Sequence, residues 1–144
     1  MWADTLLTLE RAHLQRLALW GGGCLLIGTL LVAVLAWRKT NAPLLQHFAI
    51  QTAAWGAVDV ALCIGAWRGL ALRDYAAALQ LMNFLWLNVG LDVGYVLVGA
   101  TLAIVSWRLG AKAAGIGAGI GIVVQGLALM LLDGRLIVSI GPFQ

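Results

Sequence analysis

The sequence predicts an all-α integral membrane protein, a four-helix bundle in a single transmembrane domain that covers residues 1–144. Hydrophobic residues make up 62% of the chain and charged residues only 10%, and the mean hydropathy is +0.96. Because soluble domains contain about 25% charged residues, this composition argues against a soluble globular protein. Four apolar runs of roughly 20 residues, each long enough to cross about 30 Å of hydrocarbon as a helix, supply the spans.

The expected spans cover residues 17–37, 46–67, 84–107 and 113–132. The first three each end in a Trp followed by an Arg, which is typical of the membrane interface: the indole lies at headgroup depth and the cation reaches water. These pairs are Trp37 and Arg38, Trp67 and Arg68, and Trp107 and Arg108. We interpret these Trp-Arg pairs as membrane anchors and assign them no catalytic or binding role. Short connections after the first and third spans predict antiparallel neighbours.

Two flanking segments have a weaker, amphipathic pattern. Residues 4–16 are expected either to form a short N-terminal amphipathic helix on the membrane surface or to extend the first span. A secretory signal peptide is disfavoured, because the apolar run exceeds the roughly 7–15 residues of such a signal. Residues 68–83, between the second and third spans, are expected to form a surface helix.

The charges leave the membrane orientation open. Basic residues are divided almost evenly between the two sides, and the acids outside the spans all fall on the side of the termini, which favours termini outside. Those acids are Asp4, Glu10, Asp74 and Asp133. The net charge of +3 is placed next to the membrane, where it faces lipid headgroups. The bilayer is therefore an expected partner, and nucleic acid is not.

Polar residues inside the spans are the main functional signal. Asp59 and Asp92 are each about 12 Å from a span end on the same membrane face, and Gln125 is seven residues from a span end on that face, so three helices place polar groups at a similar depth. A carboxylate near the middle of the hydrocarbon costs roughly 2.5–3.5 kcal/mol and generally has a partner or a function. Helical spacing puts further polar residues on the stripes of the two aspartates, and we expect these stripes to face the bundle interior. They are Gln51, Asn88 and Tyr95.

This polar layer has two interpretations that the sequence leaves equally open. In the first it is a site, because two carboxylates in a low dielectric repel each other and could hold a proton or share a cation. In the second it is structural, because hydrogen bonds between such side chains join membrane helices at roughly 0.6–2 kcal/mol per contact.

Glycines recur at spacings that let helices approach closely. They form small-residue pairs on the fourth span and flank Asp92 on the third. We expect these faces to be helix contacts, either within the bundle or between copies of it. The residues are Gly90, Gly94, Gly115, Gly119 and Gly121.

No cofactor or metal site is expected. Cys24 and Cys63 fall inside spans without a C-x-x-C spacing, so we interpret them as small core residues. His13 and His47 fall at opposite membrane faces, which argues against a haem held between them. A zinc site needs at least three clustered ligands, and two carboxylates with no histidine at their depth do not supply one.

Three segments resemble a family of small bacterial four-helix membrane proteins of unknown function. They are residues 47–59, residues 87–95 and residues 119–126 followed by Asp133. The most specific part is Asn88-Val-Gly-Leu-Asp-Val-Gly-Tyr95 in the third span. The resemblance implies the fold and a multi-pass protein of the bacterial inner membrane. It implies no activity, and it is compatible with an interior site.

Three classes of function remain. The sequence narrowly favours a non-catalytic accessory or assembly subunit that packs through its glycine faces, as a homo-oligomer or with other membrane subunits. One bundle leaves little volume for alternating access, and no inverted repeat or broken helix is evident. The alternative is a proton- or cation-coupled carrier or channel that uses Asp59 and Asp92. An intramembrane enzyme or a small-ligand binder ranks last, because the sequence offers no nucleophile with a base, metal cluster or cofactor motif, and no enzyme is expected.

Overall fold

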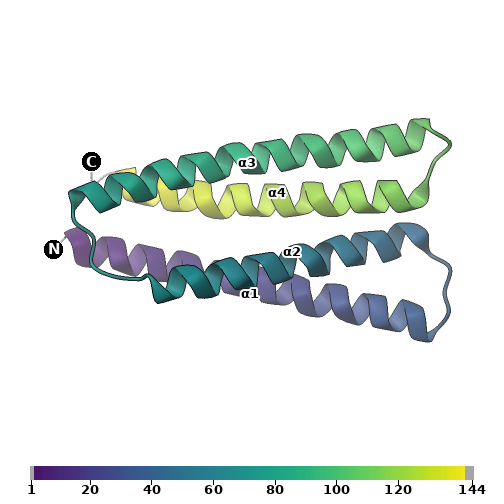
Figure 1. The fold of residues 1–144 in the computed structure, drawn as a ribbon, viewed down its shortest axis with the longest axis horizontal. Coiled ribbons are helices and arrows are strands. Elements are labelled where there is room, and N and C mark those ends of the chain that lie inside the picture. The colour runs from purple at the N-terminus through teal and green to yellow at the C-terminus, as the bar shows by residue number, and fades with distance from the viewer. Residues whose placement is uncertain (1, 142–144) are drawn as a thin grey trace.

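The chain forms a bundle of four long helices. A computed structural model describes residues 2–141. The helices are α1 (Trp2–Trp37), α2 (Pro43–Arg68), α3 (Tyr75–Arg108) and α4 (Ala113–Ile140). Each is long and apolar enough to cross a membrane. The start of α1, the α2–α3 connection and the end of α4 lie at one end of the bundle, here called the terminal end (Figure 1). The predicted all-α, four-helix architecture is confirmed.

The local sequence explains several helix boundaries. Pro43 lies in the first turn of α2, where its fixed φ suits a helix and its missing N–H is not needed. Asp74 caps α3, because its side chain accepts a hydrogen bond of 2.8 Å from the backbone N of Ala77. Gly110 has a φ of 100° in the turn after α3, a conformation that glycine adopts without steric cost.

Two segments differ from the sequence prediction. Residues 4–16 do not form a separate surface helix but belong to α1, so the expected extension of the first span is the correct alternative. Residues 68–83 are not a surface helix either: residues 69–74 form no helix, and α3 begins at Tyr75 and runs unbroken to Arg108. The physical reason is the cap at Asp74, which starts a helix that continues directly into the apolar span.

The bundle consists of two helical hairpins, α1 with α2 and α3 with α4 (Figure 1). Glycines bring their helices together in the half away from the terminal end. A Cβ at Gly99 of α3 would lie 2.7 Å from the carbonyl oxygen of Gly119 of α4. In the same half, α4 joins the hairpins by packing Gly121 against Gln51 of α2. Backbones this close leave no space between the helices here.

The terminal half is held by a different kind of contact. A cluster of buried apolar side chains joins α1, α3 and α4 near the terminal end. Its members are Leu6, Met82, Leu85, Leu136, Ile137 and Ile140. The cavity in which the site is found lies in the same half of the bundle, and Leu85 and Leu136 of the cluster are part of its wall.

Candidate functional site

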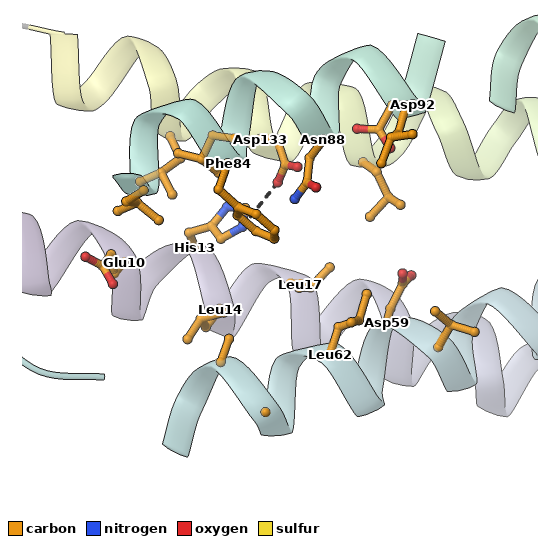
Figure 2. Close-up of a pocket in the computed structure, with 18 of the residues that line it drawn as sticks. Glu10, His13, Leu14, Leu17, Asp59, Leu62, Phe84, Asn88, Asp92 and Asp133 are labelled. Atoms are coloured by element: carbon orange, nitrogen blue, oxygen red, sulfur yellow. Dashed lines mark ion pairs between the residues drawn. The ribbon is translucent and has the colours of Figure 1, made fainter. Parts of the chain in front are cut away.

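A cavity of about 630 Å³ lies between the two hairpins in the terminal half of the bundle (Figure 2). This volume is in the range of pockets that bind small molecules, roughly 300–1,000 Å³. All four helices contribute to its walls, which are mostly apolar. The acidic residues that line it are Glu10, Asp59, Asp92 and Asp133.

At the inner end of the cavity, a chain of hydrogen bonds links three helices. Gln125 of α4 donates from its Nε2 to Oδ2 of Asp59 on α2 at 2.5 Å. The Oε1 of Gln125 accepts a bond of 3.1 Å from Nε1 of Trp20 on α1. Asp59 is only 1% exposed, so its carboxylate depends on this protein partner. The depth count placed Asp59 and Gln125 together, whereas it gave no indication of Trp20.

Asp92 lies on the opposite wall and is bonded differently. Figure 2 shows the Asp59 carboxylate pointing from α2 toward the other hairpin, and Asp92 on α3 across from it. Asp92 is 3% exposed, yet its Oδ2 has no hydrogen-bond partner among the described residues. A buried polar oxygen without a partner is uncommon in folded proteins and costs free energy. Because this oxygen is both buried and unpaired, the Asp92 carboxyl group is suited to carrying a proton.

Nearer the terminal end, a histidine faces a third aspartate. Nε2 of His13 on α1 lies 3.3 Å from Oδ1 of Asp133 on α4, and both residues are buried (Figure 2). The sequence placed His13 at the membrane face and Asp133 beyond the fourth span; the structure shows that both side chains are buried in the bundle. The helices α1 and α4 continue past the expected span limits, so these positions become part of the bundle interior.

An ion pair lies at the outer end of the cavity. Arg73, in the α2–α3 connection, donates from Nε to Oε1 of Glu10 at 2.6 Å and from Nη2 to Oε2 at 3.1 Å. The two-point geometry fixes the connection against α1. Glu10 had been assigned to the membrane surface, but it is buried.

Helical spacing contained signals for these missed residues. On α1, Gly21 and Gly28 lie on a buried stripe, and Glu10 and His13 extend this stripe toward the N-terminus. On α4, Asp133 lies seven residues after Gly126, two helical turns along the same face. Extending the stripes beyond the expected membrane boundary would have found them.

The remaining predicted polar residues divide into two groups. Asn88 and Tyr95 line the cavity, and the Tyr95 ring packs on Trp55 with 4.8 Å between ring centroids and 59° between planes. Gln51 instead packs against Gly121, in the closely packed half.

The predicted glycine faces also divide. Gly115, Gly119 and Gly121 lie at contacts inside the bundle, where an added Cβ would meet neighbouring atoms. A Cβ at Gly90 or Gly94 would have no atom within 4 Å. These two positions therefore make no contact of this kind within the chain, and they leave small residues on the surface of α3.

The polar residues that line the cavity run along one half of the bundle. Glu10 and Arg73 are outermost, His13 and Asp133 follow, and Asp59 is innermost. Beyond Asp59, the close glycine contacts fill the bundle. Within residues 2–141, this cavity therefore occupies the terminal half of the bundle.

The cavity suits proton or monovalent cation binding better than metal chemistry. Among the described residues, no three His, Cys, Asp or Glu side chains are grouped so that they could hold a metal ion. What the cavity offers is carboxylate oxygen in apolar surroundings, where charge interactions are stronger than in water.

Removing the outer ion pair should have a modest effect. Arg73→Gln is expected to lower stability by about 1 kcal/mol, because the Arg73 side chain is 28% exposed and part of the lost interaction is replaced by water. The thermal unfolding midpoint in detergent measures this change. The exposed Arg68→Gln is the matched control and should change little. A double exchange, Glu10→Arg with Arg73→Glu, should recover part of the loss; no recovery would argue against a direct pair.

Comparison with known proteins gives a family but no function. The sequence model of the DUF6992 family, described as a family of unknown function, matches residues 16–134. The match confirms the resemblance to a family of unknown function. No curated protein and no solved structure matched the chain.

Proposed function

The chain belongs to the DUF6992 family, and from the geometry of its cavity we propose that it is a non-enzymatic, multi-pass membrane protein that exchanges a proton or a monovalent cation at Asp59 and Asp92. The proposed role is that of a coupled carrier in the bacterial inner membrane. The observation that carries it is that the buried Asp92 lines the same cavity as Asp59, and that its Oδ2 has no hydrogen-bond partner within residues 2–141.

The two carboxylates provide the coupling. Negative charges that face one space of low dielectric repel each other, so a proton or cation bound at one changes the occupancy of the other. The Asp59 carboxylate accepts a hydrogen bond from Gln125, whereas Oδ2 of Asp92 has no hydrogen-bond partner among the described residues. Asp92 is therefore the exchanging group and Asp59 the fixed charge that tunes it.

Access to the second membrane side requires a conformational change. The cavity occupies one half of the bundle, and glycine contacts close the other. The hairpins meet largely through α4, so one hairpin can rock against the other without disrupting either. Motion of this kind is how many carriers alternate their access.

Ion flux in liposomes tests this proposal. The purified full chain is reconstituted with a pH-sensitive dye inside, and proton movement is followed under imposed sodium or potassium gradients. Asp92→Asn keeps the size of the side chain and removes its charge, and it should reduce flux at least tenfold. Asp74→Asn is the matched control, because asparagine is an equally good helix cap. Flux that is absent in the parent protein, or unchanged by Asp92→Asn, would reject the proposal.

A second candidate is the accessory or assembly subunit favoured by the sequence. One observation supports it: Gly90 and Gly94 offer a small-residue face on α3, where an added Cβ would meet no atom of residues 2–141 within 4 Å. Such faces join membrane helices, in a second copy or in other subunits. Native mass spectrometry of the protein extracted in mild detergent tests it. Stoichiometric foreign subunits would favour this role, and a lone homo-oligomer would favour the carrier.

A further inference from the structure

The cavity is acidic, because Asp59, Asp92 and Asp133 line it. Among the described residues, Asp133 faces the imidazole of His13, but no lysine or arginine balances the three aspartates. The arginine in its wall, Arg73, is already bonded at two points to Glu10. A bound molecule with a positive charge would compensate these carboxylates, while an anion would be repelled.

The cavity also opens sideways between α2 and α3. Val58 and Leu62 on α2 and Phe84 and Leu91 on α3 line it and are also exposed, Leu62 to 62% and Phe84 to 57%. All four side chains are apolar. In a membrane this opening faces lipid chains, so a hydrophobic molecule can enter from the bilayer without crossing water.

An aromatic pair stands beside the two inner carboxylates. Trp55 lies one helical turn before Asp59, and Tyr95 lies three residues after Asp92. Their rings pack on each other and both line the cavity. Aromatic faces attract organic cations, and the attraction is stronger when the cation and the ring are both removed from water.

We propose that the cavity binds a lipophilic monovalent cation, such as an organic ammonium with apolar substituents, which enters between α2 and α3 and places its charge between Asp59 and Asp92. This inference rests on the proposed function and names its substrate class. The walls of the 630 Å³ cavity are mostly apolar, so they cannot replace the water around a hydrated inorganic ion. A neutral lipophilic molecule would fit the walls, but it would leave the charges of the carboxylates uncompensated.

Two probe ions of the same shape and opposite charge test the inference directly. Tetraphenylphosphonium and tetraphenylborate are each measured by equilibrium dialysis against the full chain in lipid nanodiscs, with empty nanodiscs subtracted. Saturable binding of tetraphenylphosphonium, at least tenfold tighter than that of tetraphenylborate, is expected. Equal affinities, or no binding of the cation above empty nanodiscs, would overturn the inference. This comparison needs no variant and so cannot be confused by misfolding.

Variants then test which carboxylate binds the cation and whether the cation enters between α2 and α3. Asp92→Asn should weaken tetraphenylphosphonium binding at least tenfold, and Asp74→Asn should leave it unchanged. Leu62→Trp, at the opening, should slow association several-fold, whereas Leu97→Trp, at an exposed position of α3 outside the cavity wall, should not. Cation binding that is indifferent to Asp92→Asn would contradict the site.

The two proposals fail separately. Asp92-dependent ion flux without tetraphenylphosphonium binding would reject the lipophilic cation and keep ion exchange. Asp92-dependent binding of tetraphenylphosphonium without any flux would support the substrate class and reject coupled transport.

Discussion

Gly119→Ala is expected to lower the stability of the bundle by about 3 kcal/mol, the upper part of the usual range for an overpacked interior. The added Cβ would lie 2.5 Å from the carbonyl oxygen of Gly99 and 2.7 Å from the backbone N of Ala103. Both atoms are backbone, so no side chain can turn aside, and α3 must move away from α4. Thermal unfolding in detergent, followed by circular dichroism at a helix wavelength, measures the loss.

Gly94→Ala is the matched control for this prediction. An added Cβ at Gly94 has no atom within 4 Å, and alanine favours a helix over glycine by about 1 kcal/mol. The midpoint of this variant should stay unchanged or rise slightly. If both variants melt at the same temperature, close approach of α3 and α4 at Gly119 does not stabilise the bundle.

The fold was predictable because composition and span length determine it. In hydrocarbon every backbone group must bond within its own helix, so four apolar runs with short connections give an antiparallel helical bundle. The structure ends α1 at Trp37, α2 at Arg68 and α3 at Arg108, within one residue of the Trp-Arg anchors. The helix starts were less predictable, because an interfacial segment that is only weakly amphipathic has no signal to separate a surface helix from an extended span.

The sequence predicted the depth at which the polar residues of the site lie, but not which side chains of the neighbouring helices they contact. Counting residues from the span ends brought Asp59 and Gln125 to one level, and the structure joins them. The same count treated Asp133 as a surface acid, because it assumed that the interior ends with the apolar run. A helical stripe tells which residues share a face, but which neighbouring helix that face meets depends on crossing geometry. For this reason neither Trp20 bonded to Gln125 nor His13 beside Asp133 could be read from spacing alone.

Gln125→Leu is expected to cost about 3 kcal/mol of stability, because it leaves the Asp59 carboxylate buried without its donor. The change also removes the acceptor of Trp20, so α1, α2 and α4 lose the bond network that joins them at the inner end of the cavity. Asp59 cannot turn to water, since it is 1% exposed. The exposed Gln80→Leu is the matched control and should change stability by no more than about 0.5 kcal/mol.

A double variant separates the stranded Asp59 carboxylate from the lost packing around Gln125. If the cost of Gln125→Leu arises from that carboxylate, then Asp59→Leu with Gln125→Leu should unfold at a higher temperature than Gln125→Leu alone, because the buried charge has been removed as well. Strong non-additivity of this kind is expected only for residues in direct contact. Additive losses would show that Gln125 stabilises the bundle by filling space and that its bond to Asp59 contributes little. Asp59 would then depend on another partner, and its proposed role as the fixed charge beside Asp92 would lose its structural basis.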